Sequence, residues 1–255
     1  MLAAERRDLL VARLRRDGKL VAKELAAELG LSEDSIRRDL RELAALGLCQ
    51  RVYGGAVPAS PALGDYAARA QVEPGSKRAV AARAVDLVRP GGVVILDGGT
   101  TTLAVARALP QTLECTVVTH SPTVAVELLT HPGVEVLLIG GRLFKHSAVT
   151  CGAAAAEAAA AVSADVFLLG VTGVHPDAGL TTGDADEAAM KRALAARAAE
   201  TYVLASAEKL GAASPYAVLP LEDVAGVVTD GREHAVATEL AARGVPVLAG
   251  GGSRV

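Results

Sequence analysis

The residues best placed to do chemistry form the run Asp-Gly-Gly-Thr-Thr-Thr at positions 97–102. An aliphatic run precedes it and a helical pattern follows it, so backbone N–H groups, threonine hydroxyls and the positive end of a helix converge there. This combination predicts a cradle for an anion such as a phosphate group. The spacing matches neither a dinucleotide fingerprint nor a nucleoside-triphosphate loop, so neither ligand is predicted. On these residues alone, a plain turn between strand and helix is the alternative.

Three more polar loops, at positions 119–121, 140–142 and 170–184, follow apolar runs that are predicted to be strands. Open α/β sheets bind ligands at the carboxyl ends of their strands, so these loops are expected beside the cradle. Two charged features follow these loops. Glu187 and Lys191 lie four residues apart on one helical face, and Lys209 comes after the next strand. Taken alone, Glu187 and Lys191 are most simply an exposed ion pair, and the alternative beside a phosphate cradle is recognition of sugar hydroxyls. Lys209 is equally a solvated lysine and a ligand-binding one. The five histidines have no metal-ligand spacing, and neither a metal nor a cofactor is predicted.

Residues 32–40, Ser-Glu-Asp-Ser-Ile-Arg-Arg-Asp-Leu, predict a helix suited to reading DNA. Ser32 is a typical N-cap, and the apolar side chains recur at helical spacing, which leaves the arginines exposed. Arginine forms bidentate hydrogen bonds with guanine and also neutralises phosphates, so this helix fits a major groove. The alternative is a solvated helix in which Arg38 pairs with Asp34 or Glu42. The apolar stripe consists of Ile36, Leu40 and Leu43.

Two helical patterns, 5–16 and 21–29, come before this helix, and a hairpin pattern with Gly54-Gly55 as its turn comes after it. Three helices and a hairpin describe a winged helix-turn-helix domain over residues 1–57, mainly α-helical with a β-hairpin wing. This domain holds eleven basic and nine acidic residues, a net charge of +2, whereas the rest of the chain carries −5. Such a distribution favours a head that faces DNA. The candidate DNA contacts are Lys23, Ser35, Arg37, Arg38, Arg41 and Arg51.

The pattern changes after the head. Prolines and small residues predict a linker over 58–74. Over residues 75–255, seven short aliphatic runs alternate with helical patterns, which predicts an α/β domain with a mostly parallel sheet. The alanine-rich tract 153–162 is predicted to be a buried scaffold helix. The expected strands lie at 93–97, 116–119, 134–139, 166–170, 202–205, 226–229 and 245–248.

Composition limits the class of protein. Hydrophobic residues make up 51% of the chain and aromatic residues only 2%, so the core must be built from Ala, Val and Leu. No apolar run approaches the roughly 20 residues that span a bilayer. Residues 1–16 are charged throughout and lack the apolar centre of a signal peptide, so a cytoplasmic protein is expected. The three cysteines lie far apart and are expected to be reduced.

Residues 5–57 resemble the N-terminal domain of the DeoR family of bacterial sugar-catabolism regulators. The most specific shared elements are Ser-Ile-Arg-Arg-Asp-Leu at 35–40, Leu-Gly-Leu at 46–48 and Arg-Val-Tyr-Gly-Gly-Ala at 51–56. The resemblance implies that Ser35, Arg37 and Arg38 read DNA, and that repression is the usual role.

The remainder resembles the DeoR C-terminal sensor through the 97–102 run, the Val-Thr-His-Ser and Gly-Gly-Arg segments, and Gly-Leu-Thr-Thr with the Asp, Glu and Lys that follow it. The resemblance implies a fold related to ribose-5-phosphate isomerase and glucosamine-6-phosphate deaminase that binds phosphosugars without turnover. Many members have Asn at position 120 and Asp-Ser-Ser-Lys at 206–209, where this chain has His and Ser-Ala-Glu-Lys, so the effector's identity is not carried over. The effector-site candidates are Asp97, Gly98, Gly99, Thr100, Thr101, Thr102, His120, Ser121, Arg142, His175, Asp184, Glu187, Lys191 and Lys209.

The sequence therefore predicts a repressor of a sugar or polyol catabolic operon that a phosphorylated sugar releases from operator DNA. One winged helix buries little interface, so a homo-oligomer, dimer or tetramer, is expected on repeated half-sites. Two alternatives stay open, an activator built from the same parts and a sugar-phosphate isomerase or deaminase. In such an enzyme Asp97 or Glu187 would be a general base beside Lys209. An enzyme needs no DNA-binding head, which favours the regulator, and no catalytic residue is predicted.

Overall fold

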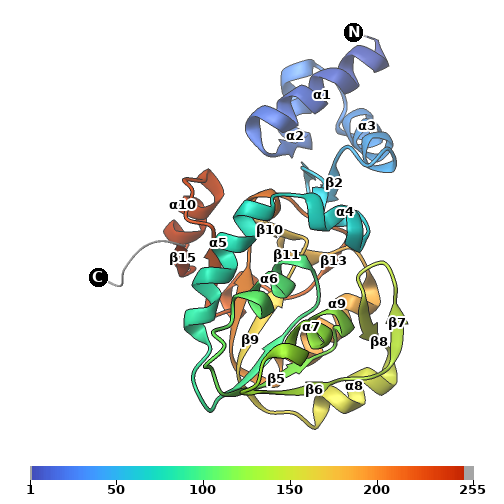
Figure 1. Cartoon of the computed structure of the whole chain (residues 1–255). Coiled ribbons are helices and arrows are strands. Elements are labelled where there is room, and N and C mark those ends of the chain that lie inside the picture. The colour runs from blue at the N-terminus through green and yellow to red at the C-terminus, as the bar shows by residue number, and fades with distance from the viewer. Residues whose placement is uncertain (1, 250–255) are drawn as a thin grey trace.

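A computed structural model describes residues 2–249, and its N-terminal part is a head of three helices and a small antiparallel sheet (Figure 1). The helices are α1 (Ala3–Asp17), α2 (Ala22–Leu29) and α3 (Glu33–Ala45). The strands are β1 (Leu20–Val21), β2 (Gln50–Val52) and β3 (Gly55–Val57), in the order β1-β3-β2. The predicted winged helix-turn-helix domain is confirmed, although the hairpin turn is Tyr53-Gly54 rather than Gly54-Gly55.

Local sequence signals set the boundary between α2 and α3. Gly30 ends α2 with a φ of 64°, a left-handed conformation that glycine adopts without strain. The Ser32 side chain accepts a hydrogen bond from the backbone N–H of Ser35 at 3.2 Å, which is the predicted N-cap. The apolar stripe of α3 is buried in the core of the head, and Arg6 of α1 pairs with the buried Asp39 of α3. The orientation of α3 is therefore fixed by both packing and charge.

The segment 58–74, expected as a linker, lies against the body. The Ser60 hydroxyl donates a hydrogen bond to the backbone carbonyl of Thr172, and the Ser60 backbone N–H donates to the carbonyl of Ala213 at 3.2 Å. The chain that leaves the head is thus held to backbone carbonyls of the body by hydrogen bonds. The segment contains the 3₁₀ helix η1 (Pro61–Leu63) and helix α4 (Tyr66–Gln71).

Seven parallel strands form the sheet of the body, in the order β15-β14-β12-β9-β4-β5-β6. The chain runs outward from β4 through β5 to β6, and outward on the other side from β9 through β12 and β14 to β15. The junction of β4 and β9 is therefore a topological switch point, where open α/β sheets bind ligands. The strands are β4 (Val93–Leu96), β5 (Cys115–Thr119), β6 (Val134–Leu138), β9 (Ala164–Gly170), β12 (Ala198–Leu204), β14 (Gly226–Thr229) and β15 (Val247–Ala249).

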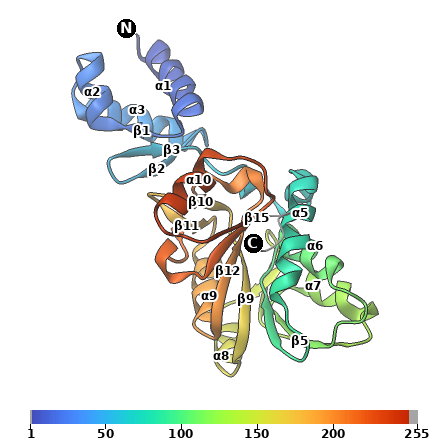
Figure 2. The same cartoon turned by 90° about the vertical axis from the view of Figure 1, so that its left-hand side faces the viewer.

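Helices cover both faces of the sheet, as an α/β domain requires (Figure 2). One apolar core lies under α5 (Pro74–Ala84), α6 (Thr100–Ala108) and α7 (Pro122–Glu127). The other lies under α8 (Ala153–Ala160), α9 (Ala185–Ala195) and α10 (Ala235–Ala242). The alanine-rich α8, predicted to be a buried scaffold helix, buries only one face, through Ala155 and Ala159, and its other face is exposed.

Short antiparallel strands surround the carboxyl end of the sheet. The pair β7 (Arg142–Phe144) and β8 (Val149–Cys151) forms a hairpin. A small sheet contains β10 (Gly173–His175), β11 (Gly179–Thr182) and β13 (Tyr216–Ala217). Short 3₁₀ turns complete the connections at η2 (Val85–Leu87), η3 (Leu128–Thr130), η4 (Ala207–Lys209) and η5 (Leu221–Asp223). Among residues 2–249, no helix is long and apolar enough to span a membrane.

Candidate functional site

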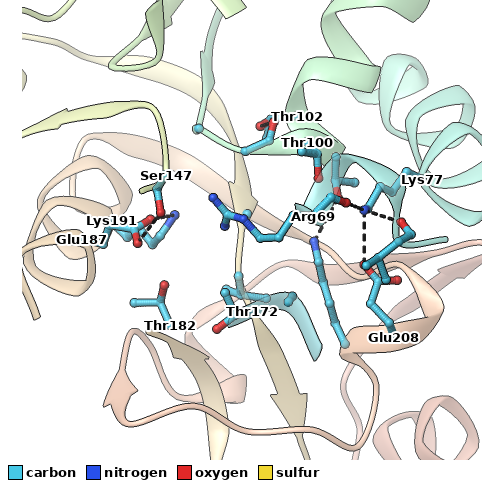
Figure 3. A pocket seen from close by; sticks show the side chains of 18 residues that line it. Arg69, Lys77, Thr100, Thr102, Ser147, Thr172, Thr182, Glu187, Lys191 and Glu208 are labelled. Carbon is cyan, nitrogen blue, oxygen red and sulfur yellow. Dashed lines mark hydrogen bonds and ion pairs between the residues drawn. The ribbon is translucent and has the colours of Figure 1, made fainter. Parts of the chain in front are cut away.

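A cavity opens at the carboxyl ends of β4, β9 and β12, and α4 and α5 contribute to its wall (Figure 3). Its position is the switch point between β4 and β9. Four cationic and two anionic side chains line it, with hydroxyls and glycines between them. The lining residues are Ala62, Arg69, Val72, Lys77, Gly98, Gly99, Thr100, Thr101, Thr102, Ser147, Gly170, Val171, Thr172, Thr182, Glu187, Lys191, Glu208 and Lys209.

The predicted cradle forms one wall of the cavity. Gly98 packs so tightly that an added β-carbon would lie 2.0 Å from a methyl group of Val149. Gly99 precedes α6 with a φ of 114°, and the first turn of α6 lines the cavity with backbone N–H groups that have no partner within the helix. The Thr102 hydroxyl donates to the carbonyl of Gly99 at 2.9 Å, whereas the Thr100 hydroxyl has no hydrogen bond among the described residues. The wall therefore offers free donors to an anion.

Asp97 is the centre of a buried charge network behind this wall. One carboxylate oxygen accepts hydrogen bonds from the Lys191 ammonium at 2.5 Å and the Gly170 backbone N–H at 2.9 Å. The other oxygen lies 2.7 Å from Nε2 of His120, whose Nδ1 lies 2.8 Å from the carbonyl oxygen of Thr150. Burial alone raises the pKa of Asp97, but Lys191 and His120 together hold the pKa of this carboxyl well below its ordinary value. The carboxylate is therefore ionised and positions Lys191.

Besides Lys191, two more lysines line the cavity. Lys209 donates to the Thr101 hydroxyl at 2.9 Å, and burial lowers the pKa of Lys209 to about 8. Lys77 donates to the carbonyls of Arg69 and Val72 at the C-terminal end of α4. Burial also lowers the pKa of Lys77, while Glu208, with a carboxylate oxygen 3.7 Å from its ammonium, opposes that shift. Lys77 thus fixes α4 on the cavity, since its ammonium complements the helix C-terminus.

Arg69 extends from α4 into the middle of the cavity, between the cradle and Glu187 (Figure 3). Its Nε is buried without a hydrogen-bond partner among the described residues. Its only hydrogen bond there is a long one of 3.4 Å, donated to the carbonyl oxygen of His146. Burial lowers the pKa of Arg69, and Glu187 opposes that shift. A guanidinium remains charged in proteins, and the buried Nε of this one lacks an acceptor.

A second polar region faces the cradle across Arg69 (Figure 3). Glu187 accepts a hydrogen bond from the Ser147 hydroxyl at 2.9 Å and lies 3.9 Å from the Lys191 ammonium. The hydroxyl of Thr182 is buried with no partner in the described part of the chain. A carboxylate accepts hydroxyl donors and a free threonine hydroxyl either donates or accepts. This end of the cavity is suited to a polyhydroxylated group.

The structure brings most of the predicted effector-site residues to one place. Three of the others, Asp97, His120 and Ser121, are fully buried behind the lining. Asp184 caps α9 by accepting from the backbone N–H of Glu187. Arg142 is exposed and pairs with Asp186 at 2.7 Å, and His175 lies along β10, so neither lines the cavity. The predicted residues that do line it are Gly98, Gly99, Thr100, Thr101, Thr102, Glu187, Lys191 and Lys209.

Sequence reasoning missed the contribution of the segment 58–77. Arg69 and Lys77 belong to the expected linker and to the start of a predicted helix, and no strand precedes either of them. Ser147 comes from the β7–β8 hairpin, which was not predicted. The only local signal is the presence of two basic residues beside small residues and prolines, and this pattern is also typical of a solvated segment. Within residues 2–249, no group of three or more His, Cys, Asp or Glu side chains could hold a metal ion.

The head carries a separate basic surface. Arg37 donates to Glu33 one turn earlier, at 2.7 Å, and Ser35 shares a hydroxyl contact of 3.0 Å with Ser32. Among the described residues Arg38 pairs with neither Asp34 nor Glu42, and Glu42 pairs with Arg7 of α1. The exposed basic residues without an ion pair among the described residues of this surface are Lys23, Arg38, Arg41 and Arg51.

Comparison with protein families assigns both parts of the chain. Residues 6–62 match a model described as the DeoR-like helix-turn-helix domain, and residues 73–231 match the DeoR C terminal sensor domain. The second match alone covers more than half of the chain.

Individual relatives agree with these matches. The chain is 38% identical to the HTH-type transcriptional regulator GlpR of Haloferax volcanii over 98% of its own length and 99% of the relative's. It is 32% identical to the putative aga operon transcriptional repressor of Escherichia coli O157:H7, over 89% and 86% of the two chains. Among solved structures, a ribose 5-phosphate isomerase A from Methanocaldococcus jannaschii aligns over 52% of each chain, with 19% identity and a TM-score of 0.39.

Proposed function

The chain belongs to the DeoR family of transcriptional regulators, and from that membership we propose that it represses a sugar or polyol catabolic operon until a phosphorylated sugar binds its cavity. It is a DNA-binding regulator and not an enzyme, as the names of its relatives indicate. The putative aga operon transcriptional repressor and the HTH-type transcriptional repressor GlcR of Bacillus subtilis support repression as the sign of control. We place its action in the cytoplasm, where its operator lies.

The observation that carries the choice of effector is the Arg69 guanidinium inside the cavity, whose buried Nε has no hydrogen-bond partner among the described residues. Four cationic side chains line the cavity against two carboxylates, with the carboxylate of Asp97 behind them, so the site has an excess of positive charge. A phosphate monoester carries close to two negative charges at neutral pH and offers three acceptor oxygens. It would satisfy Arg69 and the free donors of the cradle together. The sugar or polyol part would then face Glu187 and Thr182.

The segment 58–77 offers a direct route from the cavity to the head. Ala62, Arg69 and Lys77 line the cavity, and the same segment continues into β3 of the wing at Val57. An effector that draws Arg69 toward its phosphate also acts on α4 and the tether. It shifts the position of the head only by its differential affinity for two arrangements of this segment. We propose that the head fits the operator in the effector-free arrangement, in a homo-oligomer with two or more heads on repeated half-sites.

Effector affinity is expected to fall as pH rises through the pKa of Lys209. Burial holds that pKa at about 8 in the free protein, below the ordinary value, whereas a bound phosphate favours the charged ammonium. Above about pH 8, binding must therefore take up a proton, and affinity should fall about tenfold between about pH 7 and pH 9. Isothermal titration calorimetry with a sugar phosphate that the protein binds measures both the affinity and the proton uptake when it is repeated in two buffers of different ionisation enthalpy. Lys209→Met should bind weakly with a flat profile, and an equally flat wild-type profile would contradict the assignment.

The two functions should separate by mutation. Arg38→Ala should weaken binding to operator DNA by roughly 10- to 100-fold, since one arginine contact contributes about 1–3 kcal/mol, and should leave effector binding unchanged. Thr101→Ala removes the hydroxyl that positions Lys209, so it should weaken effector binding and leave DNA binding unchanged. Both are measured by fluorescence anisotropy on the DNA upstream of the protein's own coding sequence and by calorimetry. Circular dichroism confirms folding, and loss of both functions in either folded variant would contradict the division.

A further inference from the structure

The turn between β2 and β3 presents Tyr53, an aromatic side chain that touches nothing in the head. Its exposure is 107% of the reference value, so it buries no area in the fold. The chain has only six aromatic residues, four Tyr and two Phe, and no Trp. Others are used inside the body, as Phe167 is fully buried and Tyr66 donates to Thr123 at 3.1 Å. An aromatic residue at the tip of the wing contributes nothing to folding, which leaves binding as its use.

The backbone that carries this side chain is held in a fixed place. Tyr53 and Gly54 form a two-residue turn between Val52 and Gly55, with Gly54 at a φ of 79°. The carbonyl of Gly54 accepts a hydrogen bond of 2.8 Å from the backbone N–H of Ala22. A β-carbon on Gly55 would lie 1.8 Å from the carbonyl oxygen of Leu20, so β3 packs directly on β1 there. The turn is therefore clamped to α2 and β1, and binding would cost little ordering of the backbone.

The surroundings of Tyr53 are positively charged. A hollow of about 530 Å³ separates the wing from α3, and Lys23, Arg37 and Arg51 line it together with Tyr53. Lys23 and Arg51 form no ion pair among the described residues. Figure 2 shows the β2–β3 hairpin beside α3, on the same side of the head. A partner here must be anionic and must also offer a flat or apolar surface to a phenol ring.

We propose that Tyr53 is a DNA-contacting residue of the wing, with its hydroxyl donating to a backbone phosphate and its ring lying against the adjoining deoxyribose. DNA combines these two chemistries at every nucleotide, and Lys23 and Arg51 would neutralise the flanking phosphates. The contact is independent of base sequence, so it sets the position of the head while α3 reads the groove. This proposal rests on the DNA binding of the head described above.

The absence of Trp makes the test specific. Tyr53→Trp introduces a single fluorophore at the tip of the wing, and Tyr216→Trp, at a β13 side chain that is 43% exposed, provides the matched control in the sensor. We expect saturation with DNA from upstream of the coding sequence to shift the emission of Tyr53→Trp and to halve its quenching by acrylamide. Tyr216→Trp should show neither change. Unchanged emission and quenching of Tyr53→Trp in a complex that anisotropy shows to be formed would overturn the proposal.

Substitutions without a probe give a second measurement. Tyr53→Ala should weaken DNA binding about tenfold with little dependence on sequence, and Tyr53→Phe should lose only part of that, since the ring remains. Sedimentation velocity without DNA should give the same assembly for Tyr53→Ala and wild type, and a smaller assembly would instead make Tyr53 a contact between copies and overturn the proposal. A wild-type chain that binds no duplex overturns the proposed function itself. If Tyr53→Ala binds DNA with full affinity while Arg38→Ala binds it more weakly than wild type, only the role of Tyr53 is overturned.

Discussion

Replacing Asp97 by alanine is expected to lower the free energy of unfolding by about 3–5 kcal/mol, the cost of leaving the buried Lys191 ammonium without its hydrogen-bonded carboxylate. The carboxylate is fully buried and contacts Lys191, His120 and the backbone N–H of Gly170, and all three lose this acceptor when it is removed. For a chain of this size the midpoint of thermal unfolding should fall by roughly 10 °C. Chemical denaturation followed by circular dichroism measures the change.

Asp186→Ala is the matched control, because its carboxylate forms an exposed ion pair with Arg142. Exposed pairs contribute about 0–1 kcal/mol, so the control should unfold close to wild type. If Asp97→Ala were as stable as Asp186→Ala, the buried network would not support the site, and Lys191 would need another explanation for its position. The folded fraction of Asp97→Ala should also bind the effector poorly, since Lys191 loses the group that orients it.

Substituting Arg69 by methionine should produce a repressor that no longer responds to effector. Its guanidinium has one long hydrogen bond of 3.4 Å among the described residues, so nearly all of its donors are available to a phosphate. Charge-assisted hydrogen bonds contribute about 1.5–3 kcal/mol each, so loss of a two-bond contact should weaken effector binding by roughly 100-fold or more. Anisotropy should show normal DNA affinity and no release at effector concentrations that fully release wild type. Methionine fills much of the same space, so folding should be retained.

Arg142→Met is the matched control, since Arg142 was also predicted at the site but is exposed and lies outside the cavity. Its effector response should equal that of wild type. A wild-type response in Arg69→Met, or an equal loss in both variants, would contradict the role given to Arg69. The same pair of variants tests the segment 58–77 as the route of coupling, because Arg69 is attached to α4 and Arg142 is not.

Much of the fold was predictable because its signals are local. Buried parallel strands such as 93–96 read as continuous aliphatic runs, and the Ser32 cap and the glycine-rich turns mark element ends. The cradle at 97–102 was predictable for the same reason, since strand, loop and helix are contiguous. Alanine gives no contrast between faces, and therefore the half-exposed state of α8 was not predicted.

The rest of the site depends on contacts between distant segments. Arg69 reaches the cavity only because Lys77 holds the end of α4 and because Ser60 fastens the preceding chain to the body. Arg142 and His175 follow apolar runs, but the antiparallel β7–β8 and β10–β11 hairpins place them away from the cavity. Position in sequence after a strand indicates the edge of the sheet, and it does not specify where a hairpin then turns.

Release of DNA by a phosphorylated ligand tests the central claim most directly. The full-length protein is bound to labelled DNA from upstream of its coding sequence, and anisotropy is followed while triose, pentose and hexose phosphates, glycerol 3-phosphate and the unphosphorylated forms are added. We predict that at least one phosphorylated compound dissociates the complex, that its unphosphorylated form does not, and that Arg69→Met abolishes the response. A complex that none of the phosphorylated compounds dissociates, or that the unphosphorylated sugar dissociates equally well, would contradict the account.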